Sequence, residues 1–202
     1  MLTQPLDLYC IGGFVIYSFY GLPRPTGDID YYSAVPANLN LIEMAGEDSA
    51  LSKKYKIQLH HVAVTNLPED YATRLTEMFP RVFKNLRLFA PDAYDFVLPK
   101  LERNSANDRD DADFIFKTKK LSSQILRERY EKELRPYLWK ETWHDNTLKL
   151  WIEIFEKTNC MIPAGFAPIL LRGGPFLEAL CNCRGKARWI NQNAGSATPA
   201  VL

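Results

Sequence analysis

Long apolar runs, clustered cysteines and an excess of charge of one sign are all missing from this 202-residue sequence. No apolar run approaches the roughly 20 residues that a membrane-spanning helix needs. The N-terminus also lacks the charged segment, apolar core and cleavage site of a signal peptide. The formal net charge is only +1, which argues against a dedicated nucleic-acid-binding protein. We therefore expect a cytoplasmic protein without membrane association.

The four cysteines are too few and too scattered to predict a metal site. Cys181-Asn-Cys183 lacks a following His or Cys pair, which a zinc site would need for its other two ligands. Cys10 lies in an apolar run and is expected to be a small buried side chain. This usage of cysteine favours a reducing compartment.

Short apolar runs separated by Gly and Pro dominate the first half of the chain. Strands are predicted over 7–11, 27–35, 55–64 and 86–89. Helices are predicted over 14–20, 37–54 and 67–79.

After Pro91 the pattern becomes purely helical, with predicted helices over 93–103, 108–119, 122–134 and 146–157. A mixed part followed by a helical part predicts an α+β fold, in which helices flank a mixed sheet. We divide the chain into a core (1–97), a helical C-terminal part (98–160) and an irregular tail (161–202). Pro, Gly, Ala and Asn accumulate in the tail, which favours a poorly structured or partner-dependent arm.

The most informative stretch is Gly12-Gly13, followed after fourteen residues by Asp28-Ile29-Asp30. Residues i and i+2 of a strand point to the same side, so Asp28 and Asp30 present two carboxylates on one face. Hard oxygen ligands of this kind suit Mg²⁺, which is usually held by one or two carboxylates and substrate phosphates. Gly12 and Gly13 leave bare backbone N–H groups where a helix begins, which favours an anion.

The stretch IGGFVIYSFYGLPRPTGDIDYY resembles the first motif of the nucleotidyltransferase superfamily with the DNA polymerase β-type fold. The downstream DAYDFVLPKLERNSANDRDDADFI resembles a second segment of its toxin-like, abortive-infection branch and uncharacterised bacterial relatives. In that branch a Lys on a helix precedes an Arg-Asp-x-x-Asp cluster, here Lys100 and Arg109-Asp110 with Asp113. The resemblance covers roughly residues 7–160.

The resemblance implies a role for each residue of the motif. Asp28 and Asp30 hold Mg²⁺ as catalytic residues, Gly12 and Gly13 bind the triphosphate, and Lys100 contacts phosphates and takes part in catalysis.

Two further residues precede the Asp-Ile-Asp strand. Thr26 adds a hydroxyl to the nucleotide site, and Arg24 neutralises charge on the phosphates. The implied reaction transfers a nucleoside monophosphate to a hydroxyl or phosphate acceptor, and pyrophosphate leaves.

The sequence departs from the superfamily at the third carboxylate, which usually lies on a later strand. The expected strand, 57–62, carries no acidic residue but has the pair His60-His61. We predict His61 as a catalytic general base, because imidazole titrates near neutrality; the alternative is that alternation buries one His and exposes the other. Glu69, Asp70 and Asp95 are further candidates for the third carboxylate.

Two other groups have simpler explanations. The charged residues of 102–120 are also what helix caps and surface ion pairs require. An aromatic group could stack on bases, but its helical spacing favours core packing: Tyr130, Tyr137, Trp139, Trp143 and Trp151.

We therefore expect a Mg²⁺-dependent nucleotidyltransferase of the toxin–antitoxin type that uses a nucleoside triphosphate and an RNA, protein or small-molecule acceptor. An RNA acceptor predicts a basic rim, formed by Lys53, Lys54, Lys56, Arg81, Lys84 and Arg87. The alternatives are an aminoglycoside-type nucleotidyltransferase with an acidic cleft, and a degenerate binding module without catalysis. The sequence begins almost on the first strand, so we expect one sheet face to be less covered, and a homodimer or a cognate antitoxin to be a partner.

Overall fold

The computed structural model describes residues 4–37, 40–63 and 65–158. Its five-stranded mixed sheet has the order β3-β2-β1-β5-β4. The strands are β1 (Leu6–Ile11), β2 (Asp28–Val35), β3 (Gln58–His61), β4 (Thr76–Met78) and β5 (Leu86–Ala90). β1 runs antiparallel to β2 and parallel to β5, β2 and β3 are parallel, and β4 and β5 are antiparallel.

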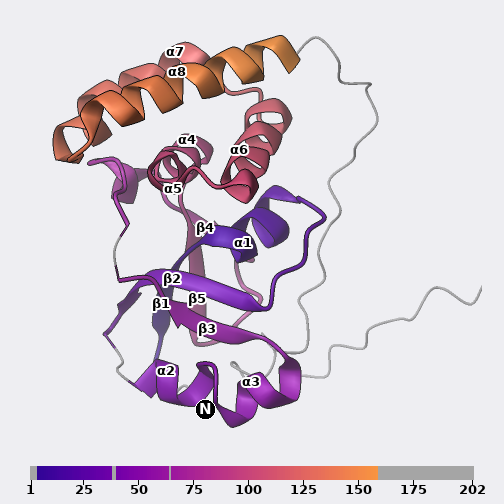
Figure 1. Cartoon of the computed structure of the whole chain (residues 1–202). Helices are drawn as coiled ribbons and strands as arrows, with labels where there is room; N and C mark the ends of the chain where they lie inside the picture. Colours follow the sequence, from indigo (N-terminus) through magenta and orange to yellow (C-terminus); the bar gives the residue numbers. More distant parts are fainter. Residues whose placement is uncertain (1–3, 38–39, 64, 159–202) are drawn as a thin grey trace, which may run out of the picture.

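Helices lie on two sides of this sheet (Figure 1). α2 (Asn40–Ala45) and α3 (Ala50–Tyr55) lie below it in the figure. Above it lie α4 (Ala93–Val97), α5 (Lys100–Arg103), α6 (Ala106–Thr118), α7 (Ser123–Arg129) and α8 (Glu141–Thr158). The predicted α+β class, with helices flanking a mixed sheet and a helical C-terminal part, is confirmed.

β1 alternates strictly, with Leu6, Leu8 and Cys10 buried; each fully buried apolar side chain contributes about 1.5–3 kcal/mol. The chain leaves β1 directly into α1 (Gly12–Val15), which continues as a π-helical turn, η1 (Ile16–Tyr20). That turn ends at Gly21, whose φ of 85° is left-handed, a conformation that glycine adopts without strain. The short buried helix and its glycine stop are as predicted.

The predicted helix over 67–79 is wrong. This segment forms a 3₁₀ turn, η2 (Tyr71–Arg74), and then β4, which pairs Met78 with Leu88 of β5. Burial of Met78 against the sheet outweighs the local helical pattern, because strand pairing depends on a partner that the local sequence does not reveal.

The helical part differs from the predictions mainly in its breaks. The predicted helix over 93–103 is two helices, interrupted at Leu98-Pro99. α7 passes into a π turn, η3 (Tyr130–Leu134), and a 3₁₀ turn, η4 (Arg135–Tyr137). One buried hydrophobic cluster extends from β1 to α8, where the Phe116 and Phe155 rings are 4.7 Å apart. The predicted tail, 161–202, lies outside the described residues.

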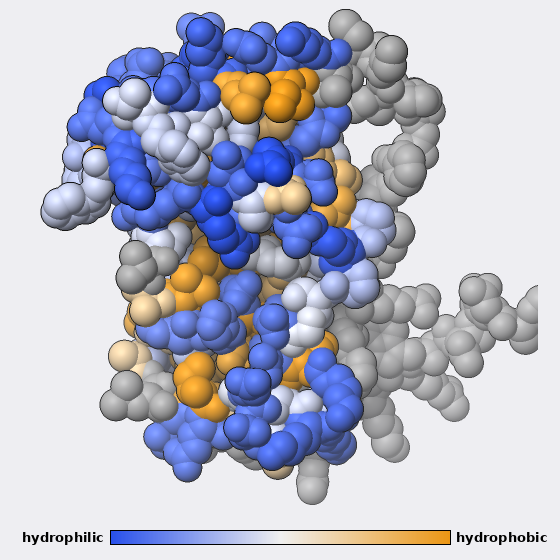
Figure 2. All heavy atoms as spheres, viewed as in Figure 1, coloured by the Kyte–Doolittle hydropathy of each residue, from blue (hydrophilic) through white to orange (hydrophobic). Residues whose placement is uncertain are grey.

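Core packing is the correct explanation for only part of the aromatic group. Tyr130 and Trp151 are buried, whereas Tyr137, Trp139 and Trp143 are exposed. Figure 2 also shows apolar atoms on the outward side of the α7–α8 layer. Among the described helices, none combines the length and the apolar character that a membrane span requires.

Candidate functional site

The centre of the candidate site is the place where β1 ends beside the start of β2. Ile11 pairs with Asp30 across the two strands, so Gly12 follows directly beside the Asp30 side chain. Gly12 has a φ of 72°, and a Cβ on it would overlap Asp30 Oδ2 and lie 3.1 Å from Asp30 Cγ. Only glycine therefore combines this backbone conformation with this close approach.

Gly13 and Thr26 form a second contact of the same kind. A Cβ on Gly13 would lie 3.2 Å from Thr26 Oγ1. The same hydroxyl oxygen accepts a hydrogen bond from the backbone N–H of Asp28 at 3.2 Å. The loop before β2 therefore lies close against the start of α1, and the hydrogen bond holds the backbone at Asp28.

Asp28 and Asp30 lie on one face of β2, and β3 supplies a partner to each. Gln58 Nε2 donates to Asp28 Oδ1 at 3.0 Å, and His60 Nδ1 lies 2.9 Å from Asp30 Oδ1. The parallel register, which pairs Asp28 with Gln58 and Asp30 with His60, produces both contacts. The sequence predicted neither, because it did not give the register of β3.

The structure places His61 away from Asp30. Alternation along β3 turns His61 to the face opposite His60, where its ring lies 5.1 Å from that of Tyr31. Both histidines are exposed, so the expectation that one of them is buried is wrong. Of the two histidines, His60 is the one that contacts Asp30.

Asp30 opens into a pocket of about 530 Å³ between the sheet and α4–α5. Gly12, His60, Lys100 and Arg103 are among the residues that line it. Its volume lies within the roughly 300–1,000 Å³ of typical small-molecule sites. The pocket therefore brings both ends of the sequence-predicted site together: the Gly-Gly turn with its carboxylate, and the lysine of the second segment.

Lys100 is not free in this pocket. Its Nζ donates to Asp111 Oδ2 at 2.8 Å and to Asp108 Oδ1 at 3.2 Å, and both carboxylates are buried. Arg24, from the loop before β2, also donates to Asp111. The predicted phosphate-contacting cations thus hold the carboxylates of α6 and connect the helical part to the loop that carries Thr26.

Arg103 is a cation of the pocket that the sequence analysis missed. It donates to Asp108 at 2.6 and 2.7 Å, while its side chain remains 74% exposed. The hydrogen bonds to Asp108, and more weakly the charge of Asp30, raise the pKa of Arg103. Its position three residues after Lys100 was the available signal, because residues i and i+3 lie on the same side of a helix.

α6 presents a different set of acidic residues to the site from the one predicted. Asp108 and Asp111 point inward, whereas Arg109 and Asp110 are exposed. Asp108 also forms a capping box with Ser105, which fixes the start of α6. Asp113 pairs with Lys117 one turn later, as the explanation by helix caps and ion pairs predicted.

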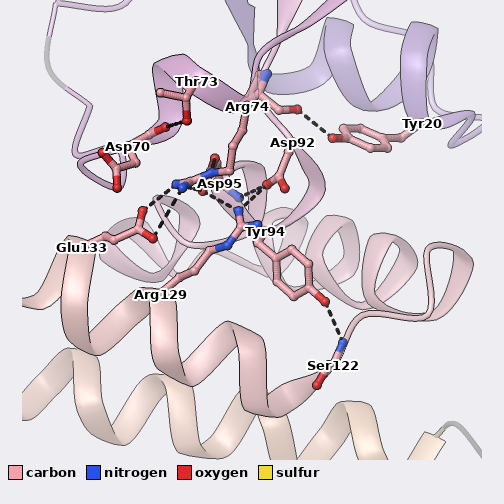
Figure 3. A network of polar contacts seen from close by, with 11 residues as sticks. Tyr20, Asp70, Thr73, Arg74, Asp92, Tyr94, Asp95, Ser122, Arg129 and Glu133 are labelled. Atoms are coloured by element: carbon pink, nitrogen blue, oxygen red, sulfur yellow. Dashed lines mark hydrogen bonds and ion pairs between the residues drawn. The ribbon is translucent and has the colours of Figure 1, made fainter.

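None of the three candidates for a third carboxylate joins Asp28 and Asp30. Figure 3 shows Asp95, completely buried, held by two hydrogen bonds from Arg74 and a third contact from Arg129. Burial raises the pKa of Asp95, against the opposing effect of Arg74. Glu69 and Asp70 are exposed around η2. Asp95 lines the pocket, but its oxygens serve the two arginines.

The predicted basic rim is divided between the two ends of the sheet. Lys53 and Lys56 line a shallow pocket of about 340 Å³ that also includes Asp28. Arg87 instead donates to Asp7 of β1 at 2.5 and 2.7 Å. Lys84 precedes β5 and therefore lies at the end of the sheet away from the β1–β2 site. The residues expected to form a basic rim for an RNA acceptor therefore do not gather at the β1–β2 site.

Asp28 and Asp30 supply too few ligands for a metal site formed by protein side chains alone, but their carboxylate oxygens suit Mg²⁺. Within the described ranges, no group of three or more His, Cys, Asp or Glu side chains is arranged to hold a metal ion. Two partly exposed carboxylates beside a pocket supply the oxygen ligands that Mg²⁺ takes from a protein when phosphates and water complete its coordination. These residues would hold the ion, which would supply charge neutralisation to a triphosphate.

A family described as "Nucleotidyltransferase of unknown function (DUF6036)" has a model that matches residues 2–159. The match includes the Gly-Gly turn, both aspartates of β2 and the whole of α8. The comparison with curated proteins gave no match, and neither did the comparison with solved structures.

Proposed function

The chain belongs to this family of nucleotidyltransferases of unknown function, and we propose that it transfers a nucleoside monophosphate from a nucleoside triphosphate to an acceptor in a Mg²⁺-dependent reaction. Asp28 and Asp30 hold the ion, and Gly12 and Gly13 receive the triphosphate.

The observation that carries this proposal is the approach of Asp30 to Gly12. At the entrance of a pocket of about 530 Å³, the Asp30 carboxylate lies so close to Gly12 that only glycine fits there. This restriction on the sequence is explained if binding requires the bare backbone at Gly12. A triphosphate at that turn makes use of both features, since it binds the backbone N–H groups and shares the ion with the carboxylates. Arg103, which is largely exposed beside the pocket, is placed to meet its negative charge.

We assign to His60 the role that the superfamily resemblance gives to a third carboxylate. A carboxylate can only accept, so His60 Nδ1 carries the hydrogen in its contact with Asp30, and Nε2 of the neutral ring is an acceptor. This arrangement orients Asp30 and leaves an atom that can take a proton from the acceptor hydroxyl. We therefore propose His60, in place of His61, as the general base.

Calorimetric titration with ATP, CTP, GTP and UTP, with and without Mg²⁺, tests the proposal. We expect Mg²⁺-dependent binding that the double substitution Asp28→Asn/Asp30→Asn abolishes. Asp110→Asn is the matched control, because Asp110 is exposed on α6 outside the pocket. A screen of RNA, protein and small-molecule acceptors with α-labelled nucleotide then measures transfer. Equal binding by wild type and the double variant contradicts the proposal.

The second candidate is a nucleotide-binding module without transfer. It is favoured by the engagement of Asp95 with Arg74 and Arg129, which leaves Asp28 and Asp30 without a third carboxylate among the described residues. Mg²⁺-dependent triphosphate binding without pyrophosphate release, in the presence of every acceptor class, identifies this alternative. An aminoglycoside acceptor and a toxin role rest on the resemblance alone.

A further inference from the structure

A second, smaller pocket adjoins the candidate nucleotide site. It has a volume of about 190 Å³ and lies between α5, the segment before η2 and the start of α8. Glu102 lines both pockets. The residues that line the smaller pocket are Asn66, Glu102, Leu138, Trp139, Lys140, Trp143 and His144. α5 and α8, which form two of its walls, contact each other (Figure 1).

His144, which lines this pocket, has an unused acceptor. The residue is only 4% exposed, and its Nδ1 lies 2.8 Å from the backbone oxygen of Lys140. A carbonyl oxygen only accepts, so Nδ1 carries the hydrogen and Nε2 of the neutral ring is an acceptor. Nε2 is buried without a hydrogen-bond partner in the part of the chain that the structure describes. Such an atom favours a ligand that donates a hydrogen bond.

Two exposed indoles stand beside this acceptor. Trp139 is 98% exposed and Trp143 is 42% exposed, although tryptophan is normally among the more buried side chains. The Trp143 ring packs edge-on against the His144 ring, with centroids 5.0 Å apart. Exposed aromatic rings next to a polar pocket are the arrangement on which single nucleobases stack.

The polar lining of the pocket includes acceptors as well as the donors Lys140, Trp139 and Trp143. Asn66 Nδ2 is engaged with Glu102 Oε2 at 2.9 Å, which leaves the other Glu102 lone pairs and His144 Nε2 as acceptors. The ligand should therefore be flat, aromatic and equipped with N–H groups. An aminoglycoside fits less well, because it has no aromatic face to stack on the two indoles.

We propose that the pocket formed by Trp139, Trp143, His144 and Glu102 binds one N–H-bearing nucleobase. The inference rests on the proposed function, since it places the base next to the site of nucleotidyl transfer. About 190 Å³ is below the roughly 300–1,000 Å³ of sites for drug-sized ligands, and so fits one ring system. The sugar and phosphates extend past Glu102 into the pocket that contains Asp30. The base belongs either to the donor triphosphate or to the end of an RNA acceptor.

Calorimetry with two sets of probes tests the inference and separates the two sources: the four nucleoside triphosphates with Mg²⁺, and single-stranded RNA trinucleotides. Trp139→Ala should weaken one set at least fivefold, because loss of one base stack weakens binding by roughly that factor or more. Trp143→Ala and His144→Phe should weaken the same set. A loss confined to triphosphates assigns the base to the donor, and a loss confined to RNA assigns it to the acceptor.

Tyr137→Ala is the control, because Tyr137 is a 53% exposed aromatic residue outside this pocket. Its affinities should stay within twofold of the wild type. Unchanged binding of both probe sets by Trp139→Ala and Trp143→Ala, with circular dichroism confirming the fold, overturns the inference.

The carboxylate variant separates this inference from the proposed function. If Asp28→Asn/Asp30→Asn abolishes Mg²⁺-dependent triphosphate binding while both tryptophan variants bind normally, the pocket is wrong and the function stands. If the tryptophan variants lose binding and the carboxylate variant does not, the base pocket stands and the metal-dependent function fails.

Discussion

The carboxylate of Asp30 lies directly over the Cα of Gly12, at a distance that leaves no room for a Cβ. Two strands produce this relationship, because Ile11 pairs with Asp30 and the chain turns into α1 at the next residue. Gly12 is therefore required for two reasons: its backbone conformation is left-handed, and a Cβ there would collide with Asp30. These requirements can be separated by experiment.

Gly12→Ala should weaken nucleotide binding and reduce the free energy of unfolding. The left-handed φ at Gly12 costs a non-glycine residue about 1–3 kcal/mol, and displacement of Asp30 should lower transfer by roughly 100-fold. Gly21→Ala is the control, since Gly21 has a φ of 85° and nothing within 4 Å of an added Cβ. It should lose stability but keep nucleotide affinity. Equal affinity losses in both variants would show that strain, not the contact with Asp30, is the cause.

The two histidines of β3 offer a matched pair for the second prediction. His60→Ala should reduce transfer by roughly 10²–10⁴-fold, the range of a lost general base. His61→Ala should leave the rate nearly unchanged, because His61 packs against Tyr31 on the opposite face. His60→Asp supplies the carboxylate that the superfamily resemblance leads one to expect and should recover part of the rate. The rate of pyrophosphate release measures each effect. A larger loss of rate in His61→Ala than in His60→Ala would refute the assignment of His60.

The sequence predicted most elements and the placement of Asp28 and Asp30 on one face of a strand, because both depend on short-range pattern. The apolar run 14–20 with its glycine stop, and the Asp-Ile-Asp strand, are visible in a few consecutive residues. The errors lie where partners are distant in sequence. β4 forms only by pairing with β5, and the contact of His60 with Asp30 depends on the register of β3 on β2. The exposure of Trp139 depends on how the chain packs just before α8.

The same limit explains Lys100. A helix pattern places it near an acidic segment but does not reveal that Asp108 and Asp111 face it. It also does not reveal that Arg24, 87 residues away from Asp111, contacts the same carboxylate. Contacts of this range join the loop before β2 to the helical part, and they determine which charges remain available to a ligand.

Lys100→Met should lower the free energy of unfolding by about 3 kcal/mol, the lower end of the cost of breaking a buried ion pair. The lower end applies because Arg103 and Arg24 still contact Asp108 and Asp111. Urea unfolding measures the change. Lys149→Met, on the exposed side of α8, should stay within about 0.5 kcal/mol of the wild type. If Lys100→Met is equally stable but fails to bind triphosphate, Lys100 serves the nucleotide and not the fold.

Asp108 makes stability dependent on acid pH. Burial alone would raise the pKa of Asp108, but hydrogen bonds from Arg103 and Ser105 and the charge of Lys100 outweigh it and hold the pKa well below 3.8. A carboxylate with a lowered pKa in the folded state contributes its full stabilisation above the unfolded pKa of about 3.9. This contribution is lost as the pH falls from there towards the folded pKa.

Asp108→Asn should therefore be less stable than the wild type at pH 7 and pH 5, and the difference should shrink at pH 3. Urea unfolding at these three pH values measures it. Asp110→Asn, exposed on the same helix, should show no comparable dependence. A difference between wild type and Asp108→Asn that stays constant from pH 7 to pH 3 would mean that the carboxylate acts through its shape and hydrogen bonds. Its charge, held by Arg103 and Lys100, would then not be what stabilises α6 against the sheet.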